Sequence, residues 1–455
     1  MPKLFERTVY SELLEWKNHW SKDYALLVEG ARRVGKSTVV KEFSEKEFKS
    51  ALIIDFYKPK PGTIELFNRY GNEYNRLFTE LQALYSVELY LGESVIVFDE
   101  IQLFPRAREM IKGLVEDGRY CYIETGSLIT VLSNAAKIMI PSEEYRIDMY
   151  PMSFEEFCWA VGASSKYDYA KNCFEQGKQM GVMHRELMEL FKTYMMIGGF
   201  PQSVSKFIES QRYSDCERVK KGILQLYHED LSKIPVKNGD VAKRIFDSVP
   251  ALLSKHEKRF RPGIIKKGSR TSNYENSLLW LDDAHICNLC WEINEPQSAI
   301  NLTIEEKSLK CYMLDTGLLL TQSFGSNILN SDEVQAAFVK NKLNLNEGMI
   351  FENAVSQELK CRGIELRFTK FARDEKHVYE VDFIVGGKKP VPIEVKSGDS
   401  SRHTSLDSLL ERNKGRITKA YIVHGKDVKK EGKITYLPIY MVGFLANSLS
   451  NRKSA

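Results

Sequence analysis

Several features that would place a protein in a membrane or outside the cell are missing from this sequence of 455 residues. No run of about 18 apolar residues occurs, so we expect no membrane-spanning helix and no membrane partner. The first residues lack the apolar core of a signal peptide. The eight cysteines are scattered along the chain, which is typical of reduced thiols. Together these absences predict a cytoplasmic protein.

The sequence also has little net charge, no internal repeat and no low-complexity tract. Its net charge of +4 neither requires nor excludes a nucleic-acid partner. One Cys-x-x-Cys pair, Cys287 and Cys290, lacks the second pair that would complete a zinc site, and we interpret it as core packing. With 43% hydrophobic residues, the chain can bury the cores of about two to four domains.

The most informative segment that is present reads Gly-x-x-x-x-Gly-Lys-Ser, at residues 30–37. It follows the apolar run 24–29 and precedes a helix-like pattern, which is the context that a phosphate-binding loop needs. Glycines let several backbone N–H groups point at one phosphate, and a helix N-terminus adds the positive end of its dipole. We expect Lys36 to contact the β- and γ-phosphates of ATP and Ser37 to bind Mg²⁺. The predicted nucleotide-binding residues are Gly30, Ala31, Arg32, Arg33, Val34, Gly35, Lys36, Ser37 and Thr38.

A second apolar run, residues 94–98, ends in Asp99 and Glu100. Continuous apolar runs of this kind favour a parallel strand that is buried on both faces. We expect Asp99 to hold the Mg²⁺ ion through water. Glu100 would polarise the attacking water, which indicates a hydrolase rather than a simple nucleotide binder. An isolated Asp-Glu pair after a strand can also be a helix N-cap, but the loop upstream favours the catalytic interpretation.

A third predicted strand, residues 120–124, ends in Thr125, Gly126 and Ser127. A hydroxyl at such a strand end can sense the γ-phosphate. Of the two hydroxyls we predict Ser127 as the catalytic one, because it lies just beyond the strand. The alternative is a strand-ending turn that starts a helix.

These segments resemble the bacterial and archaeal AAA-type ATPases that carry a C-terminal domain of unknown function. The resemblance rests on residues 29–37, 98–102 and 125–127, and it continues through 145–157, 198–201 and 312–318. In this family a glycine often precedes the arginine of the segment that corresponds to residues 145–157. In this sequence Tyr145 precedes that arginine, Arg146. The resemblance implies that an arginine of a neighbouring subunit contacts the γ-phosphate of ATP. The eligible residues are Arg32, Arg33, Arg106, Arg108, Arg119 and Arg146.

The middle of the chain has the pattern of a winged helix-turn-helix. Residues 255–270 hold seven Lys or Arg and one acid, and a helical pattern at 271–281 begins with N-cap residues. Two plausible strands follow, at 288–293 and 308–313. We favour DNA binding, by phosphate neutralisation and a helix in the major groove. The alternative is a winged helix that contacts proteins, with its charges on a solvated face.

Near the C-terminus, two predicted strands place acidic side chains close together. One strand carries Asp382, and after a turn the next carries Glu394 and Lys396, which alternation puts on one face. A preceding helix offers Glu352 as a third acid. Carboxylates on adjacent strands can hold Mg²⁺ or Mn²⁺. The lysine can orient a water or stabilise charge on a scissile phosphate.

This set of residues resembles the PD-(D/E)XK, or restriction-endonuclease-like, fold. The helix-strand-strand-strand-helix-strand order at residues 348–423 supports the resemblance, whereas Val381 replaces the proline that usually precedes the first acid. The resemblance implies Glu352, Asp382 and Glu394 as metal ligands, with Glu394 and Lys396 catalytic. The alternative is a salt-bridged strand face in an inactive fold.

The predicted fold class is α/β, with five segments along the chain. Residues 1–22 form a helical segment, and 23–150 form a P-loop NTPase core with a parallel sheet. Residues 151–235 form a helical lid, 236–345 a winged-helix-like segment, and 346–455 a restriction-endonuclease-like α/β domain. Closure of the lid over the nucleotide would change how the C-terminal half is presented.

The sequence therefore predicts a Mg²⁺-dependent AAA-type ATPase coupled to a region that binds, and in one interpretation cleaves, double-stranded DNA. Two alternatives stay open. In the first, ATP drives a switch whose inactive nuclease-like domain binds a partner protein. In the second, the protein is a DNA-binding regulator whose assembly, including any homo-oligomer, is set by ATP.

Overall fold

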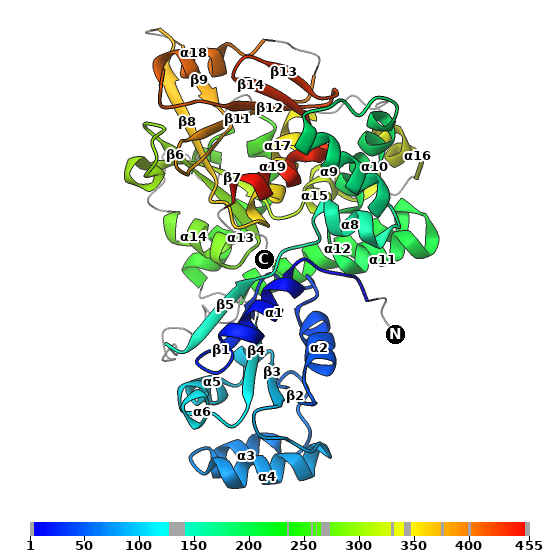
Figure 1. Ribbon diagram of the computed structural model, residues 1–455, viewed down its shortest axis with the longest axis vertical. Helices are drawn as coiled ribbons and strands as arrows, with labels where there is room; N and C mark the ends of the chain where they lie inside the picture. Colours follow the sequence, from blue (N-terminus) through cyan, green and yellow to red (C-terminus); the bar gives the residue numbers. More distant parts are fainter. Residues whose placement is uncertain are drawn as a thin grey trace. The chain divides into compact units, whose positions relative to one another are not determined.

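The computed structural model describes residues 4–126, 142–233, 236–255, 258–260, 262–264, 274–328, 332–340, 347–374, 377–398 and 402–450. Its contacts divide the chain into two compact units (Figure 1). We call them the N-terminal unit (Met1–Tyr150) and the C-terminal unit (Pro151–Ala455). None of the described helices combines the length and the apolar character that a bilayer-spanning helix needs.

A parallel five-stranded sheet forms the centre of the N-terminal unit, in the order β2-β3-β4-β1-β5. Its strands are β1 (Ala25–Glu29), β2 (Ser50–Asp55), β3 (Ser94–Asp99), β4 (Cys121–Gly126) and β5 (Glu144–Asp148). Every pairing is parallel, so the carboxyl ends of the strands meet at one edge, where open α/β sheets bind ligands. The predicted parallel sheet of P-loop NTPase type is confirmed.

Helices pack against this sheet through apolar side chains. They are α1 (Val9–His19), α2 (Lys36–Glu47), α3 (Thr63–Tyr70), α4 (Tyr74–Tyr85), α5 (Pro105–Glu109) and α6 (Ile111–Asp117), with a 3-10 turn η1 (Ile101–Leu103) after β3. Phe56, Phe67, Phe98 and Phe104 contact one another in the core between α3 and the sheet. Because β1 and β3 are buried on both faces, their sequences are unbroken apolar runs.

The described part of the C-terminal unit begins with helices. They are α8 (Phe154–Ala160), α9 (Ser164–Gln176), α10 (Met183–Ile197), α11 (Pro201–Ser210), α12 (Tyr213–Leu231), α13 (Val236–Leu253) and α14 (Glu275–Asp283). A capping box between Ser153 and Glu156 starts α8. Gly198, at φ +80°, ends α10. The predicted lid corresponds to α8–α12, and its role as a lid stays a prediction.

The hairpin of the predicted winged helix is present, but it is part of a larger sheet. Strands β6 (Cys287–Ile293) and β7 (Ile304–Met313) pair antiparallel. A 3-10 turn, η5 (Ile300–Thr303), lies between them in the chain. The other edge of β6 pairs in parallel with β8 (Arg367–Ala372), which pairs with β9 (Val378–Val381). Strands from both sides of the predicted boundary at 345/346 therefore share one sheet. Cys287 and Cys290 are buried in β6 and form no disulfide, in agreement with core packing.

A second sheet of the C-terminal unit has the order β10-β11-β12-β14-β13. Its strands are β10 (Phe383–Val385), β11 (Val391–Lys396), β12 (Ala420–His424), β13 (Lys429–Glu431) and β14 (Ile434–Pro438). The remaining helices are α15 (Thr316–Ile328), α16 (Asp332–Val339), α17 (Glu347–Lys360), α18 (Thr404–Arg412) and α19 (Val442–Leu449), with 3-10 turns η3 (Pro262–Ile264) and η6 (Ile439–Met441). Four strands, β8 to β11, lie between α17 and α18 where three were predicted, because the predicted strand 380–385 is divided at Asp382 into β9 and β10, which belong to different sheets. A restriction-endonuclease-like fold stays a prediction.

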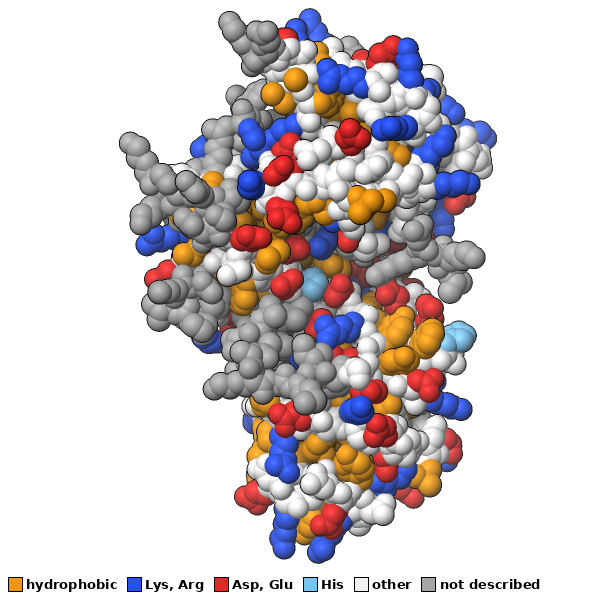
Figure 2. Space-filling view, turned by 90° about the vertical axis from the view of Figure 1, so that its left-hand side faces the viewer, with side chains coloured by type: hydrophobic (Ala, Val, Ile, Leu, Met, Phe, Trp, Pro, Cys, Tyr) orange, Lys and Arg blue, Asp and Glu red, His pale blue; other side chains and the backbone are white. Residues whose placement is uncertain are grey.

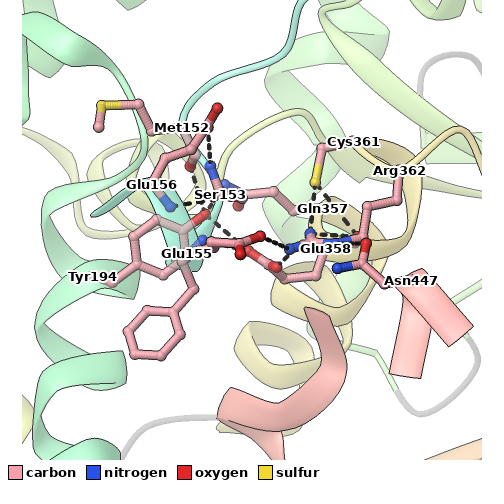
Figure 3. Close-up of polar contacts among 11 residues, drawn as sticks. Met152, Ser153, Glu155, Glu156, Tyr194, Gln357, Glu358, Cys361, Arg362 and Asn447 are labelled. Atoms are coloured by element: carbon pink, nitrogen blue, oxygen red, sulfur yellow. Dashed lines mark hydrogen bonds and ion pairs between the residues drawn. The ribbon is translucent and has the colours of Figure 1, made fainter. Parts of the chain in front are cut away.

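Figure 3 shows a buried polar junction around the carboxylate of Glu358 on α17. Glu358 Oε1 accepts hydrogen bonds from the Phe154 N–H (2.8 Å) and the Tyr194 hydroxyl (3.2 Å). Glu358 Oε2 accepts one from Arg362 Nη1 (2.8 Å), and Arg362 Nε donates to Asn447 Oδ1 (2.9 Å). Buried hydrogen bonds thus join the start of α8, the end of α10, α17 and α19.

Two segments that carried the family resemblance, Gly198–Gly199 and Asp315–Gly317, meet close to this junction. Asp315 Oδ2 accepts a hydrogen bond from the Gly199 N–H (2.7 Å). A Cβ atom at Gly199 would collide with the backbone of Met152, and one at Gly317 would collide with the backbone of Gly198. These glycines are required because the backbones approach too closely for any side chain.

Candidate functional site

The predicted phosphate loop connects β1 to α2 and is shaped by residues with positive φ. Gly30 has φ +147° and Gly35 has φ +102°, and Arg33 adopts φ +72° between them. A Cβ atom at Gly30 would collide with the carbonyl oxygen of Met149. That neighbour is fixed, because the Met149 N–H donates to the carbonyl of Glu29 (2.7 Å). Gly30 is therefore required by the packing of the loop as well as by its turn.

Lys36 is buried at the start of α2, and its ammonium group lies inside the loop. Its Nζ donates to the carbonyl oxygens of Gly30 and Ala31, each at 2.9 Å. Burial lowers the pKa of Lys36 to about 8, while the charges of Glu100 and Asp99 act in the opposite direction. An anionic ligand in the loop would favour the charged form of this lysine.

The loop and the end of β3 meet through Ser37 and Asp99. Ser37 Oγ donates to Asp99 Oδ1 at 2.7 Å. Thr125, at the end of β4, also donates its hydroxyl to Asp99 Oδ1 and accepts from the Glu100 N–H (3.2 Å). Since β4 lies between β1 and β3, Thr125 is the strand-end hydroxyl that contacts both acids. Ser127, the hydroxyl that we predicted, lies outside the described residues.

The position of Glu100 is fixed by its backbone and by a neighbour. Glu100 adopts φ +54°, an uncommon conformation for a residue with a side chain. Gln102, which is buried, donates from Nε2 to Glu100 Oε2. Glu100 does not act as an ordinary helix N-cap, because its side chain forms no capping hydrogen bond at the start of η1. Gln102 is a site residue to which sequence analysis gave no role.

Arg7 is a second residue that sequence analysis missed. It is buried, and its Nη1 donates to the carbonyl of Val34 in the loop (2.8 Å). Its Nη2 donates to the carbonyl of Tyr150, after β5 (2.7 Å). Arg7 thus fixes one side of the loop from a segment that we had predicted only to be helical. A single arginine carries no motif, so nothing in the sequence marks it.

Replacing Arg7 by methionine is expected to weaken ATP binding about tenfold, because the loop loses the charge-assisted hydrogen bond to the Val34 carbonyl, and the segment after β5 loses the one to Tyr150. Titration calorimetry with ATP and Mg²⁺ measures the change. Arg69→Met, at an exposed site on α3, is the matched control. Equal affinities of the Arg7 variant and the wild type would show that the contact does not position the loop.

The arginine candidates differ in what they contact. Arg108 is buried and makes a bidentate ion pair with Glu144, with both N–O distances at 3.1 Å. Arg119 donates to Asp117 Oδ2 (2.6 Å). Both arginines are engaged in ion pairs within the N-terminal unit, as is Arg146, whose Nη2 lies 3.2 Å from Glu144 Oε2. The candidates with exposed side chains are Arg33, Arg106 and Arg146.

The C-terminal acidic residues lie close together in the structure. Asp382, between β9 and β10, accepts from the Val395 N–H through Oδ2 (2.8 Å). Lys396 Nζ donates to Glu394 Oε1 (2.7 Å). Burial and then the Asp382 charge raise the pKa of Glu394 to about 8, against the effect of Lys396. Burial and Asp382 also raise the pKa of Glu352, so these carboxylates interact.

An unpredicted lysine lies among these acids. Lys310 of β7 is fully buried, and its Nζ lies 2.7 Å from Glu380 Oε1, 3.5 Å from Asp382 Oδ1 and 3.7 Å from Glu352 Oε2. Burial alone would lower the pKa of Lys310, but its acidic neighbours, Glu380 first, raise it well above the usual value. Lys258 forms a further ion pair with Glu352.

The residues present do not fit the predicted Mg²⁺ or Mn²⁺ site. In the ranges that the structure describes, no three His, Cys, Asp or Glu side chains are grouped so that they could hold a metal ion. The carboxylates of Glu352 and Asp382 face the Lys310 ammonium instead. We therefore assign no metal-dependent step to this cluster.

Three family models match parts of the chain. Residues 22–158 match an AAA domain, and residues 188–328 and 347–442 match two domains of unknown function (DUF8612 and DUF4143). No curated protein matches the chain. Residues 22–158 are thus an AAA-type P-loop ATPase domain, as predicted, and they are followed by domains of unknown function.

Solved structures show only distant similarity. A Walker-type ATPase of Pyrococcus abyssi is 16% identical, with 70% of this chain and 96% of that chain covered, at a TM-score of 0.40. Cdc6p from Pyrobaculum aerophilum is 12% identical, with 76% and 98% covered, at a TM-score of 0.26. Scores this low support no detailed comparison of sites.

Proposed function

We propose that this protein hydrolyses ATP, with Mg²⁺, at the phosphate loop of its AAA domain. The contact of Ser37 Oγ with Asp99 Oδ1, at 2.7 Å, carries the proposal. It places a loop oxygen and a β3 carboxylate side by side, next to the buried ammonium of Lys36. Magnesium takes oxygen ligands and is commonly bound by one or two protein groups together with phosphates. The residues present therefore fit the ion.

Each residue has a separate task in this proposal. Ser37 and Asp99 would hold the Mg²⁺ ion, which neutralises charge on the phosphates. Lys36 and the loop N–H groups bind the β- and γ-phosphates. Glu100 orients the attacking water. Thr125 fixes Asp99 and the backbone of Glu100 in the required arrangement.

Lys36→Met tests the binding step. The affinity for ATP is expected to fall about 10- to 100-fold, because a buried charge-assisted contact to phosphate is lost. Calorimetry with ATP and Mg²⁺ measures it, and Lys41→Met, exposed on the same helix, should bind like the wild type. The proposal fails if the wild type gives no heat with ATP, or if Lys36→Met binds as tightly as the wild type.

For the C-terminal unit we favour a role in binding a partner protein, under the control of ATP in the N-terminal unit. DNA binding is the second candidate. Lys258, from the predicted basic stretch, points inward and pairs with Glu352. The basic residues Lys266, Lys267 and Arg270 lie outside the described residues. On the face in Figure 2, Lys and Arg side chains are interspersed with Asp and Glu rather than gathered into one basic field. Assembly into a homo-oligomer would bring Arg33, Arg106 or Arg146 to a neighbouring ATP site.

A further inference from the structure

We infer that the ammonium group of Lys310 takes the place of a divalent cation in the C-terminal acidic cluster, so that this cluster carries out no metal-dependent phosphodiester cleavage. The acidic cluster consists of Glu352, Glu380, Asp382 and Glu394. The inference is independent of ATP hydrolysis, because all of these residues lie in the C-terminal unit.

The fold brings Lys310 to this position. It lies opposite Cys290 in the β6-β7 hairpin, on the part of β7 that is buried. Alternation along the strand puts Lys310 and Tyr312 on the same face. Both side chains reach Glu352 on α17, Lys310 at 3.7 Å and the Tyr312 hydroxyl at 3.1 Å. The hairpin therefore delivers a cation and a hydrogen-bond donor to the acid that was predicted to bind metal.

The carboxylate oxygens of the acidic cluster are almost all engaged. Glu352 contacts Lys258 through Oε1, and Tyr312 and Lys310 through Oε2. Asp382 faces Lys310 through Oδ1 and accepts from a backbone N–H through Oδ2.

The two other acids complete this pattern. Glu380 pairs with Lys310 (2.7 Å) and with Lys370 (3.4 Å) through its two oxygens. Glu394 Oε1 accepts from Lys396, and its buried Oε2 has no hydrogen-bond partner in the described part of the chain. A magnesium or manganese ion needs several oxygen ligands, and the other oxygens named here already face an ammonium group or an N–H or O–H donor.

The charges lead to the same conclusion. The four carboxylates face four ammonium groups, those of Lys258, Lys310, Lys370 and Lys396. The chain itself thus supplies as many ammonium groups as carboxyl groups. A divalent cation would have to displace the fully buried Lys310 ammonium, which has no solvent to move into. This favours the interpretation of the nuclease-like region as inactive in cleavage.

Manganese binding to the nucleotide-free full-length protein tests the inference. The wild type and Asp382→Asn are expected to give the same calorimetric isotherm with MnCl₂, because the cluster takes up no metal. Lys310→Met frees carboxylate oxygens and should gain a Mn²⁺ site, seen as new heat and a Mn²⁺-dependent rise in melting temperature. Lys307→Met, exposed on the same strand, should gain none.

Two results would overturn the inference. One is Mn²⁺ binding by the wild type that Asp382→Asn removes. The other is plasmid cleavage by the wild type with Mn²⁺ that Glu394→Ala abolishes. If Lys310→Met does not fold, these comparisons on the wild type still decide the question. Loss of ATP binding, in contrast, would leave the inference untouched and would contradict only the proposed function.

Discussion

Glu100→Gln is expected to slow ATP hydrolysis about 100-fold or more while ATP still binds. The amide keeps the shape of the side chain but cannot draw a proton from the attacking water. The Lys36, Ser37 and Asp99 contacts do not involve the Glu100 carboxylate, so the affinity for ATP should change little. Phosphate release measures turnover, and calorimetry measures binding on the same samples.

The control for this variant is Glu109→Gln, at an exposed site on α5, which should hydrolyse ATP at the wild-type rate. Because Gln102 holds Glu100 Oε2, Gln102→Ala should give a smaller loss of turnover than Glu100→Gln. Substantial residual turnover by Glu100→Gln would mean that another group positions the water.

The second large effect concerns the stability of the C-terminal unit. Glu358→Leu is expected to lower its free energy of unfolding by about 3 to 5 kcal/mol, because Arg362 is left as a buried charge that has lost its main partner. The variant also removes the acceptor for the Phe154 N–H and the Tyr194 hydroxyl. Differential scanning calorimetry of the full chain measures the fall in melting temperature.

Two comparisons separate the charge effect from simple loss of packing. Glu186→Leu removes an exposed ion pair with Lys166 and should cost less than about 1 kcal/mol. The double variant Glu358→Leu, Arg362→Leu should be more stable than Glu358→Leu alone, since the buried guanidinium is removed together with its main partner and only the partly buried Glu155 loses a contact with it (3.6 Å). A double variant that is less stable than the single one would contradict this explanation of the junction.

The sequence by itself predicted most of the proposed ATP site. Residues 30–37 are continuous in the sequence, so their spacing alone predicts where phosphates would bind. Asp99 and Glu100 follow an apolar strand, and the carboxyl ends of parallel strands meet at one edge of the sheet. Local periodicity also predicted the two helices and most of the strands near the C-terminus, but not the division of one predicted strand at Asp382 into β9 and β10.

Only the tertiary structure decided which distant residues complete the sites. Arg7 reaches the loop from before α1, Thr125 contacts Asp99 because β4 pairs with β3, and Lys310 enters the acidic cluster from β7. Thr125 was one of the two hydroxyls that residues 125–127 offered, whereas Arg7 and Lys310 belong to no local motif. Their roles arise from burial, since a charged group removed from water must find a partner, and the partner is chosen by chain packing rather than by sequence spacing.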